Sequence, residues 1–259
     1  MKVLIVTQRA PIYLGYFLHQ LLQDLSQTED VEVQGVVAFS PIFKKTKFEE
    51  IRARLNLYGT WDFLKLATTM VAGKLLSPLF RHHPTFSRIG PVLQEHELPL
   101  YQHDSPTEPQ FLERLKDTDL MVSIACPKIL KREVYELPSK GSINYHTGAL
   151  PNYRGRQPLY WAMLNGEKEI GITVHRMAEE VDAGPILSQK MADIDGLRSL
   201  HQVYLRTLPI GASALSSTII EIQKGTETVQ NNDIEGHRPN PFPGKAEGLQ
   251  FRQKGLSII

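Results

Sequence analysis

The chain has 259 residues, of which 41% are hydrophobic and 22% charged, the composition of an ordinary globular protein. That length supports one sizeable core with a small appendage, rather than two full domains. Because the formal net charge is only +1, no overall field attracts nucleic acid or acidic lipid. The single cysteine, Cys126, cannot form an internal disulfide, which fits a reducing compartment.

The predicted elements alternate between strands and helices. Residues 2–7 predict a short buried strand, residues 16–25 an amphipathic helix and residues 31–39 a second strand, which together indicate a βαβ unit. Further strands are predicted at residues 119–125, 142–146, 171–177 and 186–192, and helices at 108–116, 157–164 and 199–224. The predicted fold class is therefore α/β, with a Rossmann-like, mainly parallel twisted sheet.

Two regions stand apart from this pattern. Residues 44–83 are helix-prone and locally basic, which indicates either a helical excursion with solvated charges or a surface for an anionic substrate or membrane-associated partner. Residues 231–259 are rich in Pro, Gly and Asn and predict an extended tail that ends in a short element at residues 249–259. We expect an α/β domain at residues 1–225 with an excursion at 40–84, followed by a C-terminal extension at 226–259.

No targeting or membrane-spanning segment is expected. The apolar run at residues 3–6 is too short for a secretory signal. Residues 61–80 are interrupted by charges, Gly and Pro, so they are not expected to cross a bilayer. We therefore expect a cytoplasmic protein without stable membrane insertion.

The most informative polar residues follow the predicted strand at residues 142–146. Side chains alternate along a strand, so Asn144 and His146 project to the same side, where the strand ends. Ligands of open parallel sheets bind at this carboxyl edge. An amide and an imidazole there could both donate hydrogen bonds to one developing oxyanion.

An acidic loop follows later in the chain. The segment AEEVDAGPIL, residues 178–187, carries Glu179, Glu180 and Asp182 between two apolar strands. One of these carboxylates could orient the imidazole or accept a proton from an attacking amine. The pattern alone leaves the alternative open that His146 is a structural histidine and Asp182 a turn former.

The same segments resemble the folate-dependent formyltransferase family, which includes glycinamide ribonucleotide, methionyl-tRNA and sugar-nucleotide formyltransferases. The family signature is Asn-x-His on a strand, a Leu-Pro-x-x-(Arg/Lys)-Gly loop and an acidic loop with Asp-x-Gly. All three occur here in order, at Asn144 and His146, at residues 150–155, and at Asp182 to Gly184. The resemblance is densest over residues 119–190.

The resemblance implies a formyl transfer from 10-formyltetrahydrofolate to an amine, without a metal. Asn144 and a protonated His146 would stabilise the oxyanion, and Asp182 would hold His146 and assist proton removal. The pterin ring would be bound, largely through backbone groups, by two segments that contribute Lys128, Ile129, Leu130, Met177, Ala178, Glu179 and Val181.

The expected acceptor is a small-molecule amine, and not nucleic acid. Residues 7–11 lack the Gly-rich phosphate loop of glycinamide ribonucleotide enzymes, and little chain follows the long helix for a tRNA-binding domain. We also expect no N-terminal regulatory domain of the kind usual in formyltetrahydrofolate hydrolases. The resemblance is therefore closest to the sugar-nucleotide N-formyltransferases. Arg9 and Arg154 are candidates for binding a diphosphate, or alternatively solvated or loop-stabilising arginines.

Two alternative functions stay open, an amino-acid N-formyltransferase acting on lysine- or ornithine-like amines and a non-catalytic ligand-binding relative. The oligomeric state is also open, a homodimer included. Other polar residues receive structural interpretations. His82 and His83 have no carboxylate or cysteine at ligand spacing, Cys126 is read as a packing residue, and His175 on an apolar strand as structural.

Overall fold

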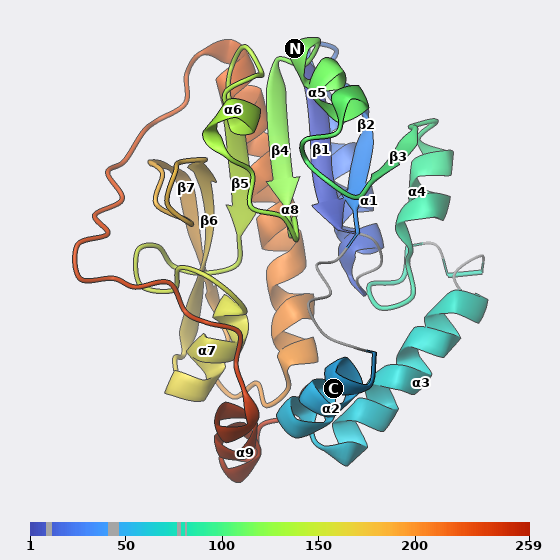
Figure 1. The fold of residues 1–259 in the computed structure, drawn as a ribbon, viewed down its shortest axis with the longest axis vertical. Coiled ribbons are helices and arrows are strands. Elements are labelled where there is room, and N and C mark those ends of the chain that lie inside the picture. The colour runs from blue at the N-terminus through green and yellow to red at the C-terminus, as the bar shows by residue number, and fades with distance from the viewer. Residues whose placement is uncertain (9–11, 41–46, 77–78, 81) are drawn as a thin grey trace.

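The protein is described here by a computed structural model covering residues 1–8, 12–40, 47–76, 79–80 and 82–259 (Figure 1). Within these residues one sheet has seven strands in the order β3-β2-β1-β4-β5-β6-β7. The strands are β1 (Lys2–Gln8), β2 (Glu32–Phe39), β3 (Leu100–His103), β4 (Leu120–Ile124), β5 (Ser142–His146), β6 (Glu169–Arg176) and β7 (Ile186–Asp193). The first five strands run parallel, whereas β6 is antiparallel to both β5 and β7. The predicted α/β fold with a mainly parallel sheet is therefore confirmed.

Helices cover both faces of the sheet. They are α1 (Leu14–Leu25), α2 (Lys47–Tyr58), α3 (Thr60–Leu76), α4 (Ile89–Glu95), α5 (Pro109–Lys116), α6 (Arg132–Tyr135), α7 (Pro158–Asn165), α8 (Leu200–Lys224) and α9 (Lys245–Gln253). The larger core lies on the face of α1 and α8, and the smaller core on the face of α5 and α6. The central strands β1 and β4 are buried on both sides, which is why they are continuous apolar runs.

The elements predicted from apolar runs and helical periodicity are present, with ends shifted by one or two residues. Helix α9 lies in the segment predicted as an extended tail with a short element at its end, and three further short elements were not predicted. Strand β3 and helix α4 precede the central strand β4, and the one-turn helix α6 follows it. Each is too short, at four to seven residues, to show a clear periodicity.

The predicted excursion contains α2 and α3, which lie beyond one end of the sheet (Figure 1). Helix α3 buries Asp62 and Gly73, but its opposite side exposes apolar residues, among them Trp61 at 78% and Leu75 at 71%. No helix among the described residues is long and apolar enough to cross a membrane. The basic residues Lys44, Lys45 and Arg81 lie outside the described part of the chain.

The end of the chain is packed against the rest of the molecule. The extended segment that follows α8 leads to α9, which packs on α2 (Figure 1). Arg252 donates from Nη1 to the Leu57 carbonyl oxygen at 2.7 Å, and the Ile258 amide donates to the buried Asp62 carboxylate at 2.6 Å. The C-terminal segment thus connects the excursion to the body of the domain.

Candidate active site

The candidate site lies where β5 ends. Asn144 and His146 point to one face of the sheet, and β5 pairs in parallel with β4 and antiparallel with β6. Asn144 stands directly opposite His175 of β6 in the register. Directly opposite residues of an antiparallel pair share a face, so His175 joins Asn144 and His146.

The loop between β6 and β7 brings Asp182 to these side chains. Asp182 has a left-handed backbone with φ of 51°, a conformation that asparagine and aspartate adopt more readily than most residues. Two residues on, a Cβ at Gly184 would collide with the carbonyl oxygen of Arg176. Only glycine therefore allows the loop to fold back onto the end of β6, which gives the Asp-x-Gly pattern a physical reason.

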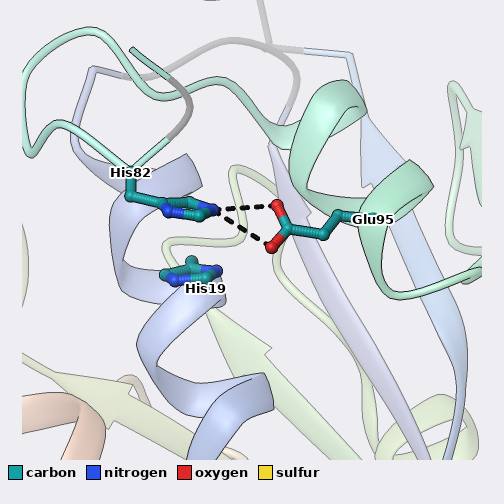
Figure 2. Close-up of side chains that lie close together, drawn as sticks. All are labelled: His19, His82 and Glu95. Carbon is teal, nitrogen blue, oxygen red and sulfur yellow. Dashed lines mark hydrogen bonds and ion pairs between the residues drawn. The ribbon is translucent and has the colours of Figure 1, made fainter.

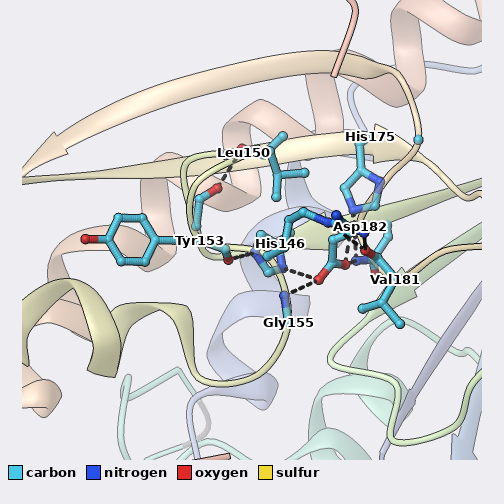
Figure 3. A network of polar contacts seen from close by, with 12 residues as sticks. His146, Leu150, Tyr153, Gly155, His175, Val181 and Asp182 are labelled. Carbon is cyan, nitrogen blue, oxygen red and sulfur yellow. Dashed lines mark hydrogen bonds and ion pairs between the residues drawn. The ribbon is translucent and has the colours of Figure 1, made fainter. Parts of the chain in front are cut away.

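The Asp182 carboxylate is the centre of the cluster (Figure 3). Its Oδ2 lies 3.6 Å from His146 Nδ1 and accepts a hydrogen bond from the Gly155 amide at 2.8 Å. Its Oδ1 accepts from Asn144 Nδ2 at 3.3 Å and lies 3.5 Å from His175 Nε2. The predicted trio of Asn144, His146 and Asp182 is thus brought together, with His175 as a fourth member.

The hydrogen-bond partners determine where the protons lie. His146 Nε2 is 2.7 Å from the Tyr153 carbonyl oxygen, which can only accept, so Nε2 carries a hydrogen. His175 Nδ1 likewise donates to the Arg176 carbonyl at 2.8 Å, leaving Nε2 to accept from Asn144 Nδ2 at 3.2 Å. A flipped Asn144 amide would put its oxygen against the Asp182 carboxylate, so the amide orientation is fixed as well.

Burial and charge set the protonation states of the pair. Burial alone would raise the pKa of Asp182, but His146, His175 and the Gly155 amide together hold that pKa at about 2. Burial lowers the pKa of His146, and the Asp182 charge only partly opposes this. His146 is therefore neutral at neutral pH with Nδ1 as a proton acceptor, which differs from the expected protonated imidazole.

Arg154, a candidate for binding a diphosphate, is bonded instead to protein groups. Its guanidinium is buried and donates to the Val181 carbonyl from Nε at 3.0 Å and from Nη2 at 2.7 Å. Nη1 donates to the His237 carbonyl at 2.7 Å, and Nη2 is 3.4 Å from Glu180. These contacts favour the loop-stabilising interpretation, since they fix the residue next to Asp182. Arg9, the other candidate, lies outside the described residues.

The two segments expected to hold the pterin meet beside the smaller core. Leu130 is buried in that core and Met177 packs against it, whereas Ile129 and Glu179 are exposed. Among the described residues, the backbone N–H groups of 129–130 and 178–181 make no hydrogen bond to backbone oxygens. Backbone donors without backbone acceptors could bind the amide edge of a flat heterocycle, and the pterin contacts of these two segments stay a prediction.

Two residues of the site have no role in the sequence-based prediction. The sequence predicts a structural role for His175. Its place beside Asn144 depends on β6 running antiparallel to β5, which the spacing does not reveal. Asn232, in the tail, donates to the Asp182 and Gly184 carbonyl oxygens. Nothing in its local sequence distinguishes it from the neighbouring Asn231. Cys126 fits its structural reading, because burial raises the pKa of its thiol to about 11.

The fold and this site define a class of protein, an open α/β domain with polar side chains at the carboxyl edge of its sheet. A sequence model described as formyl transferase matches residues 83–219, more than half of the chain. The chain belongs to the formyl transferase family.

Similar proteins include a methionyl-tRNA formyltransferase of Azobacteroides pseudotrichonymphae genomovar. CFP2, 35% identical over 196 residues that cover 70% of this chain and 60% of the relative. The chain spans about 53 to 60% of the length of the first curated relatives it matches.

Solved structures share the fold at lower identity. A sugar N-formyltransferase from Shewanella sp FDAARGOS_354 has a TM-score of 0.62 and 17% identity, covering 100% of this chain and 89% of that protein. WlaRD, a sugar 3N-formyltransferase solved in the presence of dTDP and 5-N-formyl-THF, has a TM-score of 0.58 and 16% identity, covering 100% and 82%.

Proposed function

We propose that the protein transfers a formyl group from 10-formyltetrahydrofolate to a primary amine of a small molecule, and that this amine belongs to an amino sugar carried on a nucleotide. The observation that carries the proposal is the cluster in which Asp182 lies within 3.6 Å of His146 and 3.3 Å of Asn144. A protein that only binds a ligand does not need an amide donor, a neutral imidazole and an ionised carboxylate in contact with one another.

The donor, when bound, supplies an electrophilic formyl carbon. The two Asn144 amide hydrogens point to His175 Nε2 and Asp182 Oδ1 in the structure. One of them would turn to the formyl oxygen, on which negative charge develops during the attack. Neutral His146 has Nδ1 available to take a proton from the attacking amine. Asp182, ionised and 3.6 Å away, stabilises the imidazolium that this transfer creates. The imidazolium can then return the proton to the folate nitrogen as the bond between that nitrogen and the formyl carbon breaks.

The site is supported from behind by the loop after β5 and by the tail. Gly155 and Arg154 hold Asp182 and its neighbour Val181 from the loop side. Asn232 holds the Asp182 carbonyl from the tail. This support fixes the carboxylate in position before the substrate binds. A charge that is already in place stabilises the transition state without having to reorganise during the reaction.

Two findings bear on the acceptor. Solved structures that cover the whole chain include proteins described as sugar N-formyltransferases, which supports an amino-sugar acceptor. The first curated relatives are methionyl-tRNA formyltransferases, which supports a second candidate, an aminoacyl-tRNA. A lysine- or ornithine-like amino acid is the third acceptor to be compared.

The proposal is tested by measuring release of tetrahydrofolate from 10-formyltetrahydrofolate with the purified full chain. The acceptors are 3-amino and 4-amino nucleotide sugars, lysine and ornithine, and methionyl-tRNA, with the same reaction without protein as the blank. Formylation of one nucleotide sugar well above the blank supports the proposal. Turnover only with tRNA or amino acids overturns the acceptor, and no turnover with any class overturns the enzyme assignment.

A further inference from the structure

A second polar cluster lies away from the candidate active site, between α1 and α4. His19 comes from α1, His82 from the segment after α3, and Glu95 from the end of α4 (Figure 2). His82 Nε2 is 3.1 Å from Glu95 Oε1 and 2.9 Å from Oε2. The ring of His19 stacks on that of His82 with centroids 3.8 Å apart. Metal-binding atoms of the three side chains all lie within 4.8 Å of one another.

The fold forces these segments together. Gly15 lies one turn before His19 on the same side of α1. A Cβ at Gly15 would approach the Ser87 carbonyl carbon to 2.5 Å, so the chain returning from α3 is pressed against this face. Helix α4 follows at once and packs on α1. The cluster is therefore the place where the excursion rejoins the domain.

The buried member of the cluster lacks a partner. His19 is 6% exposed, and its Nδ1 has no hydrogen-bond partner among the described residues. A buried polar atom left without a partner costs about 1–3 kcal/mol, so it calls for a physical explanation. His96 lies beside His19, with ring centroids 5.8 Å apart, and its Nε2 is buried and also unpartnered within the described chain.

We propose that His19, His82 and Glu95 bind a divalent transition-metal ion of the zinc class. Two imidazoles and one carboxylate are a donor set typical of zinc, and solvent or a further side chain completes four-coordination. The sequence spacing gave His82 no carboxylate partner, but the fold supplies Glu95 from 13 residues away.

Binding requires one local rearrangement. Zinc lies near the ring plane of each imidazole at about 2.1 Å, and two stacked rings cannot both meet that condition. His82 is the side chain able to turn, because 52% of it is exposed whereas His19 is held in α1. Turning the His82 ring would break its stacking on His19 and its hydrogen bonds to Glu95. His82 and Glu95 would then both bind the ion. The ion would then link α1, α4 and the end of the excursion.

The experiment uses the full chain, freed of metal with a chelator and titrated with Zn²⁺ alone by calorimetry, with thermal unfolding measured in parallel. We expect one equivalent to bind and to raise the unfolding temperature. His82→Gln and Glu95→Gln, both at exposed positions, should each weaken Zn²⁺ binding at least about tenfold and remove the thermal shift. Mg²⁺ should produce no shift.

His83→Gln is the matched control, since His83 neighbours the cluster but stacks on Phe86. This variant should bind Zn²⁺ as the unmodified chain does. Bound Co²⁺ should show the visible absorption of a four-coordinate site, and Zn²⁺ should displace it. The proposal is overturned if the unmodified chain binds no Zn²⁺, or if His82→Gln and Glu95→Gln bind it as tightly. The cluster would then be only a histidine–glutamate ion pair that holds the excursion in place.

Discussion

Asn232 donates from Nδ2 to the carbonyl oxygens of both Asp182 and Gly184, each at 3.0 Å, across some 50 residues of sequence. The tail thereby fixes the backbone of the loop that carries the central carboxylate of the site. Asn240 adds a second connection, because its backbone N–H donates to the Arg154 carbonyl oxygen at 2.8 Å. The C-terminal segment therefore helps to hold the candidate active site in place.

Replacing Asn232 by alanine should lower turnover more than it lowers stability. The buried Asp182 and Gly184 carbonyls lose their donor, at about 1–3 kcal/mol of unfolding free energy, and the Asp182 side chain loses its fixed position. We expect at least a tenfold fall in kcat in the formyl-transfer assay, with a cooperative unfolding transition retained. Asn231→Ala is the control, since the neighbouring Asn231 is exposed. Equal behaviour of the two variants would show that the tail does not position Asp182.

Arg154→Lys should fail to substitute for arginine although the charge is kept. A lysine ammonium cannot reproduce the planar guanidinium, which donates hydrogen bonds to the Val181 and His237 carbonyl oxygens at the same time. The variant should lose about 1–3 kcal/mol of unfolding free energy and most of its kcat, with a smaller effect on the KM for the acceptor. Arg156→Lys, at an exposed position over the Phe242 ring, should change little. If Arg154→Lys raised only the acceptor KM, Arg154 would be binding the acceptor's phosphates.

The stability of the protein in acid should depend on Asp182. A carboxyl with a folded-state pKa of about 2, below the ordinary value near 3.9, contributes stability that is fully present above about pH 5 and is lost as the pH falls towards 2. The contribution is on the order of 2 kcal/mol. Urea unfolding at several pH values between 7 and 3 should therefore show a shallower acid loss for Asp182→Asn. Parallel pH profiles for the two proteins would contradict the ionised, charge-stabilised carboxylate.

Much of the sheet could be predicted from the sequence because its strands are distinctive. Central strands buried on both faces must be continuous apolar runs, as at β1 and β4. The alternation along β5 also suffices to put Asn144 and His146 on one side. Strand β3 could not be predicted, because its sequence, LYQH, has only one buried residue and therefore shows no apolar run.

The remaining site residues depend on tertiary relationships that no local pattern records. His175 faces Asn144 only because β6 turns antiparallel after a parallel run of strands. Asn232 lies in a polar tail, and its contacts with Asp182 exist only once that tail has packed on the loop. His82 and Glu95 meet because the excursion returns to α1 at Ser87. Local sequence determines the strands, whereas chain direction and packing determine these contacts.

The sharpest prediction concerns the three residues that surround the reacting carbon in the proposed function. Asn144→Ala should lower kcat by about a hundred- to thousand-fold, the usual cost of losing one donor at a developing oxyanion. His146→Asn and Asp182→Asn remove the proton acceptor and its counter-charge, so each should lower kcat by about a hundred- to ten-thousand-fold. Folate affinity should change little, because these interactions strengthen only as charge develops.

Combining the variants should lower kcat by less than the product of the single effects. The three residues act as a unit, so one substitution already removes most of their joint contribution. His175→Gln gives an internal comparison. It removes the acceptor that orients the Asn144 amide at 3.2 Å but leaves His146 and Asp182 in contact, so we expect a smaller loss than for Asn144→Ala. Formyl transfer to nucleotide amino sugars, with folate binding measured separately, distinguishes these outcomes. Near-normal turnover in both His146→Asn and Asp182→Asn would mean that the chemistry takes place elsewhere, because neither the proton acceptor nor its counter-charge would then be needed.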